Sequence, residues 1–85
     1  MGRKRGLIKM MDDKILDFFK KNPNTGLYDV SAWIYTQDPS IWQRNATPHL
    51  ACRKKVQKRI EVLYTFGYLN RYNDGRRSVY TVRDD

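Results

Sequence analysis

The sequence predicts an α+β fold in which three helices are followed by a C-terminal β-hairpin. Apolar residues recur with a helical period of about 3.6 as far as Gly67, and the period falls to about 2 after it. Asn73-Asp74-Gly75 divides this last part in two. A chain of 85 residues that is 40% hydrophobic forms one domain with one modest core. We assign residues 1–10 to a basic N-terminal arm and residues 11–85 to the domain.

The first helix is predicted from about residue 12 to residue 21. Asp12-Asp13 at its start and Lys20-Lys21 at its end complement the helix dipole. Asn22-Pro23-Asn24-Thr25-Gly26 ends it, because proline disfavours helix in the residue before it. The residues expected on its buried face are Met11, Ile15, Phe18 and Phe19.

The second helix is expected to begin at Asp29 or Ser31 and to reach about Thr36, after an extended bridge at Leu27-Tyr28. Its buried residues would be Val30, Trp33 and Ile34. Residues 37–46 are expected to be irregular, with one short turn around Ser40-Ile41-Trp42. We expect both Ile41 and Trp42 to dock on the core.

The third helix has the clearest boundaries. Thr47 is an N-cap residue, and Pro48 occupies the first helical position, where its missing N–H costs nothing. Gly67 suits the position after the helix end. The buried stripe is formed by Cys52, Val56, Ile60 and Leu63.

The hairpin is predicted from strands at residues 68–72 and 78–82. Asp74-Gly75 between them favours a tight turn, since these residues tolerate the positive φ that such turns need. The aromatic residues serve the core for the most part, and Tyr72 beside the turn is the best candidate for an exposed phosphate contact.

The composition excludes several classes of protein. One cysteine, Cys52, cannot build a disulfide framework, and together with one histidine, His49, it cannot close a zinc site. No nucleophile motif or glycine-rich loop indicates an enzyme or a cofactor. No apolar run is long enough to span a membrane, and a cytoplasmic location is expected.

The net charge of +8 is concentrated in the second half of the chain. From Arg44 to Arg77 there are nine Lys or Arg residues and two acids, a net charge of +7. Five of the seven residues from 53 to 59 are basic. Since duplex DNA is a dense line of negative charge and its major groove admits a helix, this distribution favours double-stranded DNA as the partner.

The motif Val56-x-x-x-Ile60-x-x-Leu63-x-x-x-Gly67-Tyr68-Leu69, the basic hairpin 73–77 and Tyr80-x-Val82 occur in this order. This arrangement resembles the winged helix-turn-helix family, and in particular small transcriptional regulators of archaea and their viruses. The resemblance implies a third helix in the major groove and a wing on the backbone or the minor groove. It also implies a location at the nucleoid, or in the host cytoplasm if the chain is viral. Residues 37–46 depart from the family pattern by lengthening the connection between the second and third helices.

The third helix can be divided into faces. At about 100° per residue, Lys54, Lys58 and Glu61 point nearly opposite to the buried stripe, with Gln57 on one flank. We expect Lys54, Gln57 and Lys58 to face base edges, and Gln57 to pair with adenine. The residues expected to reach the flanking phosphates are Arg53, Lys55 and Arg59.

Two further basic segments are candidates for DNA contacts. Arg76 and Arg77 at the hairpin tip would reach the backbone or the minor groove, although charges at a hairpin end also deter strand pairing. The arm residues Arg3, Lys4 and Arg5 either follow a groove or form a solubilising tail.

The leading hypothesis is a sequence-specific regulator that binds double-stranded DNA. The alternatives are a sequence-tolerant architectural or chromatin protein and a module that binds RNA or an acidic protein. Binding to a membrane surface is disfavoured, because the apolar stripe of the third helix is committed to the core. Whether the chain acts as a monomer or a homodimer stays open.

Overall fold

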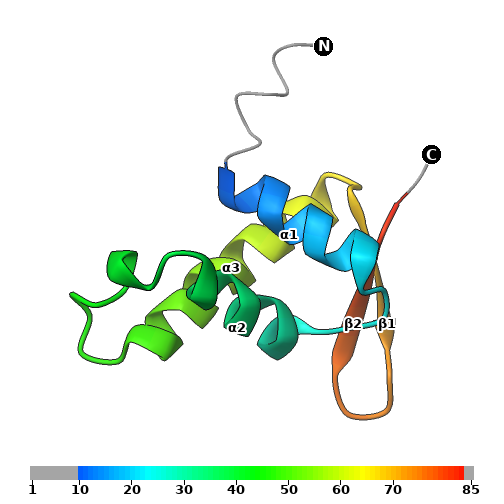
Figure 1. Ribbon diagram of the computed structural model, residues 1–85. Helices are drawn as coiled ribbons and strands as arrows, with labels where there is room; N and C mark the ends of the chain where they lie inside the picture. The colour runs from blue at the N-terminus through cyan, green and yellow to red at the C-terminus, as the bar shows by residue number, and fades with distance from the viewer. Residues whose placement is uncertain (1–9, 84–85) are drawn as a thin grey trace.

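In the computed structural model, which describes residues 10–83, the chain forms three α-helices and one antiparallel hairpin (Figure 1). The helices are α1 (Met10–Lys21), α2 (Leu27–Gln37) and α3 (Pro48–Thr65), with a 3-10 turn, η2 (Pro39–Ile41), between the last two. Strands β1 (Leu69–Asn73) and β2 (Ser78–Val82) pair from Leu69 opposite Val82 to Asn73 opposite Ser78. The α+β class and the layout of a winged helix are confirmed.

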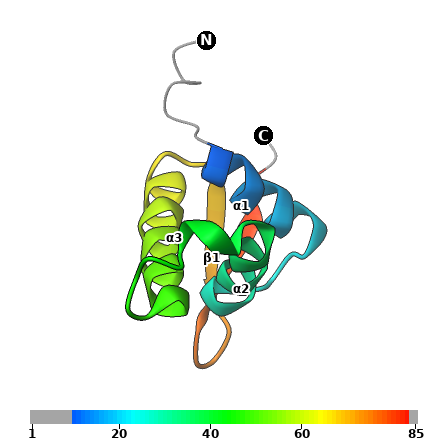
Figure 2. The same cartoon turned by 60° about the vertical axis from the view of Figure 1, so that its left-hand side comes forward.

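The hairpin packs beside the helices, and its tip projects past them (Figure 1). Figure 2 shows that the first turns of α2 and α3 lie toward the same end of the molecule as this tip. The start of α1 and the end of β2 lie at the opposite end. One end of the molecule therefore presents the beginnings of two helices and the hairpin tip together.

The core lies where the three helices meet the hairpin. All four residues predicted on the buried stripe of α3 are buried there, and Ile15 and Phe19 of α1 pack against the same cluster. Phe19 also contacts the ring of Tyr80 on β2, with 5.4 Å between ring centroids. Met11, Phe18 and Trp33 are only partly buried. The rest of the cluster is Val30, Ile34, Trp42 and Leu69.

The extended bridge predicted at Leu27-Tyr28 is wrong, because both residues belong to the first turn of α2. The Asp29 carboxylate accepts a hydrogen bond from the Gly26 backbone N–H at 3.2 Å, and the helix starts at Leu27, two residues before Asp29 and four before Ser31, the two expected starts. The extended residue is Thr25, which bridges to Tyr80 of β2. Gly26 is required at this crossing, since a Cβ on it would lie 2.9 Å from the backbone oxygen of Ser78.

Two other predictions need correction. Trp42 docks on the core as expected, but Ile41 does not, because its side chain is 59% exposed. Ile41 ends η2 and Trp42 follows it; successive side chains in such a turn point about 120° apart, so Trp42 faces inward and Ile41 outward. The first strand begins at Leu69 and not at Tyr68, since the Tyr68 N–H caps α3 by donating to the carbonyl of Leu63 at 2.9 Å.

Candidate nucleic-acid interface

The buried stripe and the two ends of helix α3 fix how the helix is turned about its own axis. Pro48 occupies the first turn, and Gly67 (φ +84°) closes the other end with a hydrogen bond from its N–H to the carbonyl of Tyr64 at 3.0 Å. Lys54, Gln57 and Lys58 are exposed as a consequence. We call the outward row Lys54, Gln57, Lys58 and Glu61 the α3 ridge.

Two hollows flank the α3 ridge. The larger, about 900 Å³, lies between α3, the start of α1 and η2, and the second, about 270 Å³, lies between α3, the start of α2 and the hairpin. Gln57 and Glu61 line both hollows and therefore mark the crest between them. Lys55 lines the larger hollow, beside an apolar floor of Met11, Ile41 and Trp42.

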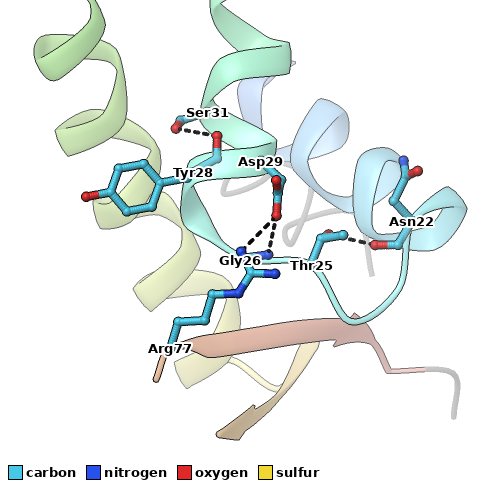
Figure 3. Close-up of polar contacts among 7 residues, drawn as sticks. All are labelled: Asn22, Thr25, Gly26, Tyr28, Asp29, Ser31 and Arg77. Carbon is cyan, nitrogen blue, oxygen red and sulfur yellow. Dashed lines mark hydrogen bonds and ion pairs between the residues drawn. The ribbon is translucent and has the colours of Figure 1, made fainter. Parts of the chain in front are cut away.

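Arg53 lies at the hairpin side of α3. Its guanidinium carbon stands 4.7 Å from the ring centre of Tyr28, a cation–π contact with the first turn of α2. Tyr28 is 64% exposed, and it points from α2 toward α3 in Figure 3. The contact places Arg53 against Tyr28, which lines the smaller hollow, and sequence patterns on α3 alone do not reveal Tyr28 as its partner.

Arg59 turns toward α1 and away from the α3 ridge. Its Nε donates to Asp12 Oδ1 at 2.9 Å and its Nη2 to Asp12 Oδ2 at 2.7 Å. The Asp12 side chain is completely buried and that of Arg59 is 24% exposed. This two-point contact raises the pKa of Arg59 above its ordinary value. The phosphate contact predicted for Arg59 stays a prediction that this geometry does not favour.

A sequence signal for the Asp12–Arg59 pair exists. Asp12 is three and seven residues before Ile15 and Phe19, so it shares their buried face. A carboxylate on a buried face needs a cation, and Arg59 borders the buried stripe of α3. The prediction that Asp12 serves only to complement the helix dipole does not account for its side chain pointing into the core.

The hairpin tip is a loop of residues 74–77, in which the Asp74 N–H donates to the Arg77 carbonyl at 2.8 Å and Gly75 has φ +78°. Arg76 is exposed. Arg77 instead reaches back to α2, where its Nη1 lies 3.2 Å from Asp29 Oδ2 (Figure 3). Both side chains of this pair are about half exposed, which leaves Arg77 accessible to solvent. Tyr72 is 53% exposed, in agreement with the prediction that it reaches solvent.

The other residues considered from the sequence add no basic side chain to this surface within the described residues. Arg3, Lys4 and Arg5 fall outside the described residues 10–83. Cys52 is buried with its thiol 3.6 Å from the Ser31 carbonyl, whereas His49 is exposed and stacks on Tyr35, so the two do not face each other. Burial raises the pKa of the Cys52 thiol.

Residues 10–83 offer neither a metal centre nor a membrane-spanning helix. The side chains of His, Cys, Asp and Glu there form no group of three that could hold a metal ion. In the same residues no helix is both long and apolar enough to cross a bilayer. In comparisons with protein-family models, curated proteins and solved structures, none matches this chain.

Proposed function

We propose that this chain is a winged helix-turn-helix protein that binds double-stranded DNA as a sequence-specific transcriptional regulator. The observation that carries the proposal is the α3 ridge, where Lys54, Gln57 and Lys58 are exposed along the larger hollow and Gln57 also borders the smaller one. A helix of about 10–12 Å diameter fits a major groove about 12 Å wide. The hollows leave room on either side for the two phosphate backbones that border that groove.

The side chains of this surface match the two tasks of DNA recognition. Gln57 on the crest offers a donor and an acceptor, which together fit the major-groove edge of adenine. Lys54 and Lys58 donate to guanine or to phosphate. Lys55 and Arg53, on opposite sides of the crest, would neutralise the two bordering backbones.

The hairpin extends the same surface. Its tip lies toward the same end as the first turns of α2 and α3, and Arg76 is exposed on it (Figure 2). A duplex whose major groove receives α3 would bring its backbone or its adjacent minor groove to this tip. Arg76 therefore supplies a second, sequence-tolerant contact.

A lysine-rich ridge also suits a sequence-tolerant architectural protein, because a lysine is a point charge without the two-point geometry that reads a base. Selection from a random duplex library at near-physiological salt separates the two functions. A regulator enriches one motif and keeps its affinity when random DNA competes, whereas flat enrichment would reject the specific regulator. Equal or tighter binding of single strands or RNA would reject the duplex itself.

A single-residue test uses Lys58→Ala, with Lys20→Ala as its charge-matched control on the exposed face of α1. Loss of one phosphate or base contact should weaken binding and lower the slope of log affinity against log salt by about 0.9 if phosphate is the partner. The control should leave both quantities unchanged. If Lys58→Ala bound duplex DNA as tightly as the unmodified chain, the proposal that α3 enters the major groove would be rejected.

A further inference from the structure

One acid stands on the otherwise basic α3 ridge. Glu61 follows Gln57 by four residues and Lys58 by three, so all three project from the same face of the helix. Its side chain is 52% exposed, and it lines both hollows as Gln57 does. A free carboxylate in this position would be repelled by a DNA backbone, so its surroundings decide whether it is tolerated.

Arg71 of β1 holds this carboxylate from the hairpin side. Its Nη1 lies 3.2 Å from Glu61 Oε2, and its guanidinium carbon stands 4.1 Å from the ring centre of Tyr64. Hydrogen bonding with Tyr80, directly opposite Arg71 in the hairpin, and then the charge of Glu61 raise the pKa of Arg71. Arg71 is thus held between the Glu61 carboxylate and the Tyr64 ring and offsets the charge of Glu61.

The contact with Arg71 uses one carboxylate oxygen. The hydrogen bond joins Nη1 to Oε2, which leaves Oε1 able to accept another hydrogen bond. Carboxylates accept hydrogen bonds and donate none when ionised. Cytosine presents an amino donor in the major groove, whereas adenine places the N7 acceptor beside its amino group and would repel a carboxylate at that point.

We propose that Glu61 is a specificity-determining residue that accepts a hydrogen bond from the amino group of one cytosine, and that Arg71 is its positioning residue. This inference rests on the proposed function, since it assumes α3 in the major groove. A single hydrogen bond predicts about a fivefold to tenfold preference for cytosine at that position.

The test compares motifs selected from random duplex DNA by the full chain, by Glu61→Gln and by Asp17→Asn. Asp17 is a matched control: it is 50% exposed on α1 and pairs with Lys21 at 3.3 Å, so its substitution changes net charge equally. We expect Glu61→Gln to reduce the cytosine preference to less than twofold at one position, with the other positions unchanged. Asp17→Asn should retain the whole motif.

The outcomes separate the two proposals. A motif from the unmodified chain that Glu61→Gln and Glu61→Met both leave intact would overturn the role of Glu61 and reduce its contact with Arg71 to a surface ion pair, since methionine removes the oxygen acceptor that glutamine keeps. Absence of any motif from the unmodified chain would overturn the sequence-specific function, and the inference with it. Circular dichroism of each variant confirms that it is folded.

Arg71→Gln tests the positioning role. It should lower the cytosine preference at the same position and have no further effect on that preference when combined with Glu61→Gln. A purely structural or general electrostatic role would lower stability or affinity for all sequences equally and would leave the preference unchanged. If the double variant instead lost cytosine preference by the sum of the losses in the two single variants, Glu61 and Arg71 would act independently, and the positioning role of Arg71 would be rejected.

Discussion

Replacement of Arg59 by Met removes the guanidinium that meets the buried Asp12 and keeps most of the aliphatic stem. Breaking a buried ion pair from one side costs about 3–5 kcal/mol, because the remaining buried charge loses the hydrogen bonds and the opposite charge of that pair. The Asp12 side chain is fully buried but Arg59 is 24% exposed, so we expect the lower end of this range, about 3 kcal/mol. In a domain of this size that loss lowers the Tm by at least about 12 °C.

The assay is urea unfolding followed by circular dichroism, with Arg76→Met as the control. Arg76 lies exposed in the hairpin loop, so its replacement should change the free energy of unfolding by no more than about 0.5 kcal/mol. Asp12→Asn and the double variant complete a cycle that should show a coupling between the two residues.

The same variant tests the role of Arg59 at the DNA. If Arg59 holds α1 against α3, Arg59→Met loses stability, and its salt dependence of DNA binding at low temperature stays that of the unmodified chain. A free energy of unfolding within about 0.5 kcal/mol of the original, with a salt slope lower by about 0.9, would refute the reasoning and return Arg59 to the phosphate contacts.

Three further predictions concern the core and the turns. The Cys52 thiol is buried and has a raised pKa, so up to mildly alkaline pH it should react with a thiol reagent far more slowly than free cysteine does. In denaturant it should react at the rate of free cysteine. A fast reaction in the folded protein would contradict its burial. Gly26→Ala should lower the free energy of unfolding in urea by about 1–3 kcal/mol, because the new Cβ would lie 2.9 Å from a backbone carbonyl oxygen. Gly75→Ala, at φ +78° with open space around it, should lower it by about 1 kcal/mol. Equal losses would indicate that β2 can shift to make room at Gly26. Trp42→Ala should cost about 3–5 kcal/mol and Ile41→Ala less than about 1 kcal/mol, and the reverse order would place Ile41 in the core.

Local patterns predicted most of the fold. The stripe of α3 and the positive φ of Gly67 follow from helical period and from end chemistry, both of which involve residues only a few positions apart. The prediction that Ile41 docks on the core is wrong, because apolar character alone does not reveal which of two neighbouring side chains a short turn directs inward. The start of α2 was missed because the cap is Asp29 acting on Gly26, and a glycine lacks the side chain that usually marks an N-cap.

The site was less predictable than the fold, because charge alone does not say which cations are already paired. Arg59 meets Asp12 across 47 residues, and Arg77 meets Asp29 across 48. Such pairs depend on how the elements pack, which no local period contains. The outward direction of Lys54, Gln57 and Lys58 was predictable, since it follows directly from the buried stripe of the same helix.

The start of α2 is attached to both neighbouring elements, through Tyr28 under Arg53 of α3 and through Asp29 at Arg77 of the hairpin. These contacts join α3 and the hairpin into one preorganised body around a common anchor. A polyanion that touches both would order little additional backbone, so little conformational entropy would be lost on association. Its association rate would then depend on diffusion and long-range charge attraction, with no slow folding step before contact.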